Sequence, residues 1–506
     1  TINSSGINIS GVATAGIVSA TTLYGDGSNL TGVAMSIAPI SYNPDVNDTQ
    51  VTLASGIGIT FTERIKAGTG NITLRLVSAG GTVVENFGVG SSVTINNNEI
   101  SIDPTADLSA DTVYHLSYPS GSFTNTGGDV SYVGTAYTFA AKPLFSHLFV
   151  GGRNQYGSLG LNQSEAELYG YSSPVQLGSD TTWNFVAQGT GFTPVASIKS
   201  DGTLWTWGWN YNGALGLNQA HSISVSSPTQ IPGTNWSAVT SGQYGATATK
   251  TDGTLWVWGS DGGARLGTNS RDQHRSSPVQ LPGTDWGTGG DKSSCNHNGA
   301  HVIKTNGTLW CWGENGYGTL GQNNGTYYSS PVQIPGTTWS KISGATQHSL
   351  GLKTDGTLWA WGRNSFGQLA QNNVTSYSSP RQIPGTTWSI IHCNNNFSYG
   401  IKTDGTLWGW GENRKGQLAQ NNVTEYSSPI QIPGTTWASV RGGDYSTGAT
   451  KTDGTFWRWG YGNWGNLGQN NTVQYSSPVQ IPGTTWSTDQ YHIGGVAYGY
   501  QAIKDA

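Results

Sequence analysis

The chain has 506 residues, a formal net charge of −5 at pH 7 and only 10% charged residues. Because it has no run of lysine or arginine that would meet phosphate, we expect no nucleic-acid partner. It has no apolar stretch of transmembrane length, so we expect no membrane insertion. Its three cysteines are too few for a disulfide framework, which argues against a disulfide-stabilised scaffold.

Residues 1–35 are poor in both charged and large apolar side chains. Asp26 is their one charged residue, and the rest are mainly Thr, Ser, Asn, Gly and small apolar residues. A segment so short and core-poor cannot fold alone, so we expect it to be disordered or to be ordered by other chains. Residues 24–33 resemble a motif of fibre and structural proteins in tailed bacteriophages. The resemblance implies an attachment and oligomerisation segment that contacts other virion proteins and forms a homo-oligomer, with a trimer favoured.

Residues 36–142 contain short alternating segments, for example residues 58–62, 71–76 and 99–102, separated by Gly- and Asn-rich turns. About a hundred residues of such strands predict an Ig-like β-sandwich. The segment resembles the bacterial Ig-like modules of surface-layer and adhesive proteins. It has neither the cysteine pair nor the buried tryptophan of an antibody-type domain.

Residues 143–506 form a repeat array. Six copies of Asp/Asn-Gly-Thr-Leu/Phe-Trp-x-Trp-Gly occur, and their first glycines are 49 to 54 residues apart. A period of about fifty residues, with four short strands per unit and no helical periodicity, predicts the blades of a β-propeller. The phrase Pro-Gly-Thr-x-Trp, or a degenerate form of it, ends at Trp183, Trp236, Trp286, Trp339, Trp388, Trp437 and Trp486.

Each repeat can be interpreted residue by residue. The two tryptophans of Trp-x-Trp lie at i and i+2 and so share one face of a strand. Because the residue between them varies, we expect it to face a looser environment. The Asp-Gly pair before them suits a tight hairpin. Its carboxylates recur once per blade, so we interpret them as turn residues rather than acid-base pairs or calcium ligands; they are Asp252, Asp355, Asp404 and Asp453.

Seven blades are predicted from the phrase Ser-Ser-Pro, which begins at Ser172, Ser226, Ser276, Ser329, Ser378, Ser427 and Ser476. The last residues, 501–506, are similar to the segment that precedes a hairpin glycine, and residues 147–154 are similar to the tryptophan strand that follows it. We therefore expect one blade to contain both ends of the domain, which leaves no free sheet edge.

The phrases at residues 312–321 and 343–352 resemble the repeat of the regulator of chromosome condensation family. The resemblance covers about residues 143–506 and implies a seven-bladed propeller, which is a fold and not an activity. The founder of that family is a nucleotide-exchange factor that also binds chromatin. The low charge of this chain gives little support for the same role.

The sequence carries no catalytic, phosphate-binding or dinucleotide-binding motif, so we predict no enzyme and no cofactor. The nearest approach to a metal site is His297 and His301 beside Cys295. A strand-and-turn context favours a polar loop over a metal centre, and we predict no metal. We interpret Cys295, Cys311 and Cys393 as small packing residues.

The loops that precede Ser-Ser-Pro differ between blades. Their spacing is 12, 10 and 9 residues in the first three blades and 8 in the last four, which share a Gln-Asn-Asn phrase. Loop variation on a repeated scaffold favours recognition there; drift, or contact with the Ig-like domain, is the alternative. The predicted ligand-binding residues are Glu165, Glu167, Tyr169, His221, Arg271, Asp272, His274 and Arg275. A second candidate surface, with packing as its alternative role, consists of the turn aromatics Tyr156, Tyr317, Phe366 and Trp464.

Together these parts predict an all-β protein of a virion surface, a tail fibre or decoration. An N-terminal attachment segment would be followed by an Ig-like spacer and by a propeller that binds a host-surface glycan or protein. The alternative is a secreted bacterial adhesin or matrix protein, extracellular or on the cell surface. A third class, an enzyme or exchange factor, lacks a catalytic constellation.

Overall fold

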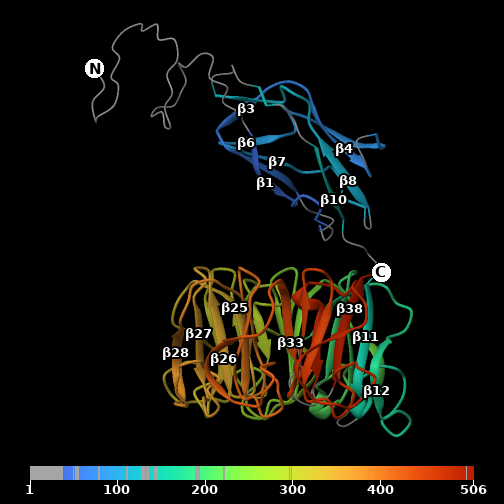
Figure 1. Ribbon diagram of the computed structural model, residues 1–506. Helices are drawn as coiled ribbons and strands as arrows, with labels where there is room; N and C mark the ends of the chain where they lie inside the picture. The colour runs from blue at the N-terminus through green and yellow to red at the C-terminus, as the bar shows by residue number, and fades with distance from the viewer. Residues whose placement is uncertain are drawn as a thin grey trace, which may run out of the picture. The chain divides into compact units, whose positions relative to one another are not determined.

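The computed structural model describes residues 38–48, 51, 56–77, 80–106, 108–109, 112–126, 131–132, 136–141, 146–187, 194–219, 223–295, 297, 299–496 and 499–505. The chain divides into two compact units, Thr1–Pro143 and Leu144–Ala506 (Figure 1). The predicted attachment segment, residues 1–35, lies outside the described residues. Within the described ranges, no helix is long and apolar enough to cross a membrane.

The first unit is a β-sandwich. One sheet has the strand order β1-β2-β7-β6, the second β10-β8-β4-β5, and β3 pairs with β9. Alternate residues of β2, Ile57, Ile59 and Phe61, point into a core that also contains Ile72 and Leu74 of β4. The strands are β1 (Pro39–Asn43), β2 (Ile57–Phe61), β3 (Ile65–Ala67), β4 (Asn71–Leu76), β5 (Val83–Gly88), β6 (Thr94–Asn96), β7 (Glu99–Ile102), β8 (Val113–Ser117), β9 (Phe123–Asn125) and β10 (Ala136–Ala140).

The second unit contains, among its described residues, seven four-stranded antiparallel sheets, which we number as blades 1 to 7. Blade 1 combines β11 (Ser146–Arg153) and β12 (Gly170–Gln176) with β37 (Ile493–Val496) and β38 (Gly499–Asp505). Blades 2 to 7 each consist of four consecutive strands, so the fold is the all-β propeller that the repeat predicts. Three single-turn 3₁₀ helices accompany them: η1 (Gln155–Gly157), η2 (Tyr211–Gly213) and η3 (Gln490–His492).

The strands of blades 2 to 4 are β13 (Trp183–Val186), β14 (Val195–Lys199), β15 (Leu204–Gly208), β16 (Val225–Ile231), β17 (Trp236–Gly242), β18 (Gly245–Lys250), β19 (Leu255–Gly259), β20 (Arg275–Leu281), β21 (Ser293–Cys295), β22 (Gly299–Ile303), β23 (Leu309–Gly313) and β24 (Tyr328–Ile334). Those of blades 5 to 7 are β25 (Trp339–Gly344), β26 (His348–Lys353), β27 (Leu358–Gly362), β28 (Tyr377–Ile383), β29 (Trp388–Cys393), β30 (Phe397–Lys402), β31 (Leu407–Gly411), β32 (Tyr426–Gln431), β33 (Trp437–Gly442), β34 (Ser446–Lys451), β35 (Phe456–Gly460) and β36 (Tyr475–Ile481).

The residue between the two tryptophans is buried, so the expectation of a looser environment is wrong. In blade 2, Thr206 is only 1% exposed, and its hydroxyl donates a hydrogen bond to the carbonyl of Leu215. In blade 4, Cys311 is fully buried. A propeller blade packs on both faces, because it has a neighbour on each side, so neither side of this strand meets solvent.

The second tryptophan of each repeat joins one blade to the preceding one. The indole N–H of Trp361 in blade 5 donates to the carbonyl of Thr319 in blade 4 at 2.8 Å, and the side chain is fully buried. The same bond, between 2.6 and 3.0 Å, is made by Trp207, Trp258, Trp312, Trp410 and Trp459.

A backbone bond accompanies each indole bond. The N–H of an asparagine in one loop donates to the carbonyl of the first serine of Ser-Ser-Pro in the next blade. For example, Asn323 bonds to Ser378, and Asn470 of blade 7 bonds to Ser172 of blade 1, both at 2.7 Å. The chain of bonds therefore continues through the junction between the last blade and the first.

The ring closes through β11 and β38, which pair antiparallel from Ser146↔Asp505 to Gly152↔Gly499. This is the pairing predicted from the similarity of the two ends. Gly151 stands where the other blades have their second tryptophan, and a Cβ there would lie 2.6 Å from the ring of Tyr500. Tyr500, fully buried, fills the missing space.

Deleting residues 143–152 tests the importance of this closure. The deletion removes most of β11, including the fully buried Leu148 and Val150, which contribute about 2 kcal/mol each by burial, and it leaves β38 without a partner on that side. We expect aggregation, or a clearly lower melting temperature in calorimetry, because a hydrophobic sheet edge becomes exposed. A deletion variant that melts like the parent would show that closure is dispensable.

Candidate functional site

The loop between β11 and β12 contains three of the predicted ligand-binding residues. Glu165 pairs with Arg153 at 2.6 Å, and the Arg153 guanidinium lies 5.3 Å from the ring centroid of Tyr169. Glu167 accepts hydrogen bonds from the backbone N–H and hydroxyl of Ser164, and these bonds lower the pKa of its carboxyl group. The two carboxylates thus shape the loop, whereas Tyr169 is 57% exposed.

The loop between β19 and β20 is organised by Asp261, which sequence reasoning missed. This buried carboxylate accepts from the N–H of Leu266 and from the hydroxyl of Ser270. In five of the other blades the same position is an asparagine, such as Asn364, whose side-chain oxygen accepts from Leu369, and in blade 7 it is Gly462. The only indication of this role in the sequence is that the third blade has an aspartate, Asp261, at a position where most blades have an asparagine.

The other predicted residues of this loop have separate partners and do not form one site. His274 accepts from the N–H of Asp261 through Nδ1 at 3.0 Å, and Arg275 donates to Gln273. Arg271 lies 5.5 Å from the ring centroid of Tyr327, and the exposed Asp272 has a positive φ of 62°. His221 lies outside the described residues.

Four aromatic residues from blades 1, 2 and 3 form one group, which we call the aromatic cluster: Tyr156, Trp209, Tyr211 and Tyr244. Trp209 is stacked between Tyr156 and Tyr211, with centroid distances of 5.3 and 5.0 Å and interplanar angles of 16° and 26°. Tyr244 contacts both Trp209 and Tyr211. Tyr156 is 40% exposed and Tyr211 37% exposed, so the cluster reaches the surface.

The cluster has charged neighbours. The guanidinium of Arg265 lies 5.1 Å from the centroid of Tyr244 and pairs with Glu314 of blade 4 at 2.7 Å. The imidazole of His297 packs edge-on against Tyr244 with a centroid distance of 5.1 Å. The three longer loops of blades 1 to 3 contribute Tyr156, Trp209, Tyr211 and Arg265, so the cluster lies among the loops that vary most.

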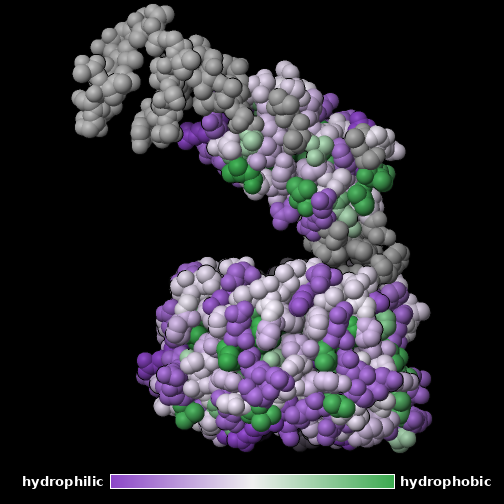
Figure 2. Space-filling model, viewed as in Figure 1, coloured by the Kyte–Doolittle hydropathy of each residue, from purple (hydrophilic) through white to green (hydrophobic). Residues whose placement is uncertain are grey.

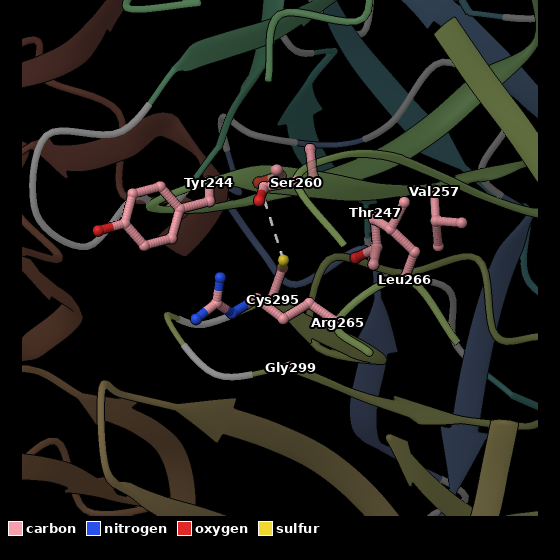
Figure 3. A pocket seen from close by; sticks show the side chains of 10 residues that line it. Tyr244, Thr247, Val257, Ser260, Arg265, Leu266, Cys295 and Gly299 are labelled. Atoms are coloured by element: carbon pink, nitrogen blue, oxygen red, sulfur yellow. Dashed lines mark hydrogen bonds between the residues drawn. The ribbon is translucent and has the colours of Figure 1, made fainter. Parts of the chain in front are cut away.

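A narrow pocket lies beside Tyr244 at the junction of blades 3 and 4 (Figure 3). The Cys295 thiol points into it and lies 3.8 Å from the carbonyl oxygen of Gly245. Burial raises the pKa of this thiol to about 12, which keeps it protonated at neutral pH. The lining is Tyr244, Gly245, Ala246, Thr247, Val257, Ser260, Arg265, Leu266, Cys295 and Gly299.

The other predicted turn aromatics do not join the cluster. Arg363 lies over both Tyr317 and Phe366, with distances to the ring centroids of 5.4 and 5.9 Å. Trp464 packs edge-on against Tyr461 of the same blade at 4.9 Å. Tyr317 is 46% exposed, so it remains an accessible surface ring, although its surroundings are cationic rather than aromatic.

The repeated turn carboxylates have structural partners. In blade 5, Oδ1 of Asp355 accepts from the N–H and the hydroxyl of Thr357 at 3.0 and 2.7 Å. These bonds lower the pKa of the carboxyl group, and the same holds for Asp252, Asp404 and Asp453. Over the described part of the chain, no group of three His, Cys, Asp or Glu residues could hold a metal ion. Of the residues considered for a metal, His301 is buried with Nε2 3.0 Å from the carbonyl oxygen of Thr319.

Comparison with known proteins identifies the modules. Residues 201–248, 306–352, 355–400 and 404–450 match the regulator of chromosome condensation (RCC1) repeat. Residues 340–368 and 390–417 match a second description of the same repeat. Residues 36–140 match the bacterial Ig-like domain. The chain therefore combines RCC1 repeats with a bacterial Ig-like domain.

Individual proteins show the same relationship. The ultraviolet-B receptor UVR8 of Arabidopsis thaliana is 28% identical over 184 residues, which is 36% of this chain and 40% of the receptor. The crystal structure of human WBSCR16 superposes with a TM-score of 0.62 at 18% identity, over 71% of this chain and 99% of WBSCR16. Prp20p of Saccharomyces cerevisiae, described with its binding to Gsp1p and histones, gives 0.58 at 17% identity, over 71% of this chain and 91% of Prp20p. At these identities the structures show an RCC1-like propeller fold alone.

Buried histidines in blades 4 to 6 predict a pH dependence of stability. Burial lowers the pKa of His301 to about 4 and of His348 to about 3, from an ordinary value of 6.5. Below pH 6.5 the unfolded chain binds protons that the folded chain does not, so stability is full above pH 6.5 and falls as the pH drops towards 4. We expect a loss of about 2 kcal/mol per buried histidine between pH 7 and pH 5.

Chemical denaturation of the wild type and of His348→Gln at both pH values measures this contribution. We expect the variant to lose less stability than the wild type between pH 7 and pH 5. Equal losses in the two proteins would contradict the assignment.

Proposed function

We propose that this chain is a non-enzymatic attachment protein whose propeller binds a carbohydrate on a host surface through the aromatic cluster. The observation that carries the proposal is the stack of Tyr156, Trp209 and Tyr211, which brings three rings from two blades together at the surface. A rigid aromatic surface with polar edges is suited to the apolar face of a sugar ring, and it loses little conformational entropy on binding.

The polar surroundings of the cluster suit hydroxyl recognition. Arg153 and Glu165 in the loop of Tyr156 form one charged pair, and Arg265 and Glu314 beside Tyr244 form another. Both pairs are partly exposed, with side-chain exposures between 16% and 30%. Fixed guanidinium and carboxylate groups offer donors and acceptors in a planar geometry that adjacent sugar hydroxyls can match.

For the whole chain, we propose a tail fibre or surface decoration of a virion. The resemblance of residues 24–33 to phage fibre motifs supports an attachment segment, and the bacterial Ig-like domain supports a spacer. A secreted bacterial adhesin or matrix protein built from the same modules is the alternative. In both cases the partner at the distal end is a surface glycan or protein and not a nucleic acid.

A second candidate function is protein binding like that of Prp20p, which binds Gsp1p and histones. A formal net charge of −5 disfavours the association of this chain with nucleic acid and with acidic proteins. The glycan proposal has the more specific structural support, because the stacked rings are a feature of blades 1 and 2 and not of the repeat in general.

Substitution of the cluster tests carbohydrate binding. We expect Trp209→Ala, and Tyr156→Ala to a smaller extent, to reduce binding of the full chain to a glycan array by about fivefold or more, because each disrupts the stack of rings that forms the binding surface, and an aromatic contact is worth roughly 1 kcal/mol or more. The readout is fluorescence of labelled protein on the array, with melting temperature as the measure of folding.

Tyr317→Ala is the matched control, because Tyr317 occupies the same position of the repeat as Tyr156 but lies outside the cluster. It should bind like the wild type. If Tyr317→Ala loses binding while Trp209→Ala retains it, the site lies on the other turn aromatics. If both variants retain binding, the propeller does not take part in recognition.

Assembly through residues 1–35 is tested by mass. We expect light scattering to give an oligomer, a trimer in the favoured case, for the full chain and a monomer for a chain that begins at Ala34, because the outer edge strand of each blade is short and carries a proline, which disfavours pairing with another chain. Equal monomeric masses for both chains would overturn the proposed role of this segment.

A further inference from the structure

Two grooves of the propeller, each between adjacent blades, have the same composition. Each has a volume of about 410 Å³, which is within the range of small-molecule sites. The groove between blades 4 and 5 is lined by Gly321, Gln322, Asn323, Pro335, Gly336, Trp339, Lys353, Trp359, Ser379 and Pro380. The groove between blades 7 and 1 is lined by the repeat equivalents Gly468, Gln469, Asn470, Pro482, Trp486, Lys504, Phe149, Ser173 and Pro174.

Outside such grooves, the side of the propeller seen in Figure 2 is polar, with hydrophobic residues scattered singly. It offers no continuous apolar patch in this view, so a ligand with an apolar face has to use a local depression. The tryptophans and prolines of the two grooves supply one.

Each groove contains a lysine held against aromatic rings. The Nζ atom of Lys353 lies 5.0 Å from the ring centroid of Trp339 and 4.4 Å from that of Trp359. Among the described residues, no carboxylate oxygen lies within 4 Å of this ammonium group. The nearby turn carboxylate of Asp355 is bonded through Oδ1 to Thr357. Lys353 is half-buried and therefore presents a fixed positive charge to the groove.

In blade 4 the equivalent lysine, Lys304, has a carboxylate partner. Lys304 lies 4.7 Å from the ring of Trp286 and 5.0 Å from that of Trp310, as in blade 5, but it also pairs with Asp285 at 3.0 Å. Asp285 directly precedes the tryptophan of Pro-Gly-Thr-x-Trp, and Thr338 occupies that position in blade 5. In blade 2 the equivalent Lys199 also has an anionic partner, Asp180, which lies three residues before Trp183. The residues just before the tryptophan thus supply an anionic partner for the lysine in some blades and not in others.

We propose that the grooves with an unpaired lysine bind acidic sugar residues, that is, pyranoses that carry a carboxylate. The carboxylate pairs with the ammonium group of Lys353 in one groove and of Lys504 in the other. The apolar face of the ring packs on the proline and aromatic lining, and the amides of Gln322 and Asn323 meet its hydroxyls. The apolar lining favours a sugar over a bare inorganic anion, which would leave those side chains without a contact.

Equivalent lysine grooves are repeated around the ring. Blade 6 has the same residues around Lys402, namely Gln371, Pro384, Trp388 and Trp408, with Thr387 before the tryptophan. Weak sites repeated around one ring bind a polymer of acidic sugars far more tightly than each binds one unit. These grooves share no residue with the aromatic cluster, so the proposal does not depend on carbohydrate binding by that cluster.

The test uses the full chain and glucuronate, with glucose as the neutral probe, in calorimetric titrations. The triple variant Thr338→Asp, Thr387→Asp, Thr485→Asp copies Asp285 into three blades and supplies each lysine with an internal partner. The matched control carries Asn at the same three positions, a residue that the chain itself has there at Asn235. We expect about tenfold weaker glucuronate binding for the Asp variant and wild-type binding for the Asn variant.

The reverse variant, Asp285→Thr, frees Lys304 and is expected to increase the amount of glucuronate bound per chain. The same titrations are repeated in a Trp209→Ala background, where the Asp and Asn variants are expected to differ in glucuronate binding as before, which separates this proposal from the proposed function. Equal binding by the Asp and Asn variants, or equal binding of glucose and glucuronate by the wild type, would overturn the proposal. So would the absence of glucuronate binding to the wild type.

Discussion

The propeller depends on one hydrogen bond that is repeated between blades, from the indole N–H of a buried tryptophan to a carbonyl of the preceding blade. Burying an indole without a partner for its N–H is costly, so this bond fixes both the distance and the orientation of adjacent blades. It also dictates other residues. Gly216 has a φ of +71°, and a Cβ there would lie 2.8 Å from Nε1 of Trp258. Glycine suits that position for space as well as for conformation, and blades 5 and 6 fill it with the smallest alternative, Ala370 and Ala419, at φ values of 57° and 56°.

The contacts between adjacent blades determine which residues of the repeat can differ from blade to blade. The asparagine of the Gln-Asn-Asn phrase uses its backbone to reach the next blade, so the phrase is part of the scaffold in blades 4 to 7. Asn162, Asn218 and Asn269 make the same bond in blades 1 to 3. The residues that follow this asparagine, up to Ser-Ser-Pro, are the ones that become longer and more charged in blades 1 to 3. Tyr156, Trp209 and Tyr211 lie in the turns that precede this variable part, and Tyr244 lies between β17 and β18. The lysine grooves, in contrast, are built from residues of the scaffold itself, and carboxylates at two positions before the tryptophan, Asp180 in blade 2 and Asp285 in blade 4, pair with the lysine.

Much of the fold could be predicted from the sequence because its signals are local and repeated. The period, the Asp-Gly turns and the similarity of residues 147–154 to the tryptophan strand are all visible in the chain, and β11 pairs with β38 accordingly. The burial of Thr206 could not be predicted from variability, because variation there reflects several ways of filling a packed space and not exposure. Tolerance to substitution and contact with solvent are different properties in a structure that packs on both faces.

The candidate site was less accessible to sequence reasoning. Glu165 and Glu167 look like free charges in a loop, but their partners Arg153 and Ser164 lie 12 and 3 residues away in the same loop. Tyr156 was identifiable as a turn aromatic, whereas its stacking partner Trp209 lies 53 residues further on, in the next blade. The available signal was positional: Trp209 directly follows Trp-Gly, where most other repeats have a charged or small polar residue.

The junction of blades 7 and 1 lacks the tryptophan whose indole joins the other pairs of blades. Gly151 replaces the tryptophan, and Tyr500, from the neighbouring strand of blade 1, fills the space from the other side of the pair. The guanidinium of Arg458 lies 4.4 Å from the Tyr500 ring and donates to the hydroxyl of Ser446, and burial lowers the pKa of Arg458 to about 10. This cation lies beside an apolar cluster that contains Phe456, Ile481 and Trp486, so closure combines the β11–β38 ladder with side-chain packing. The strands that carry both ends of the propeller are thus also the ones that hold its ring together, and the loop of Tyr156 begins directly after them.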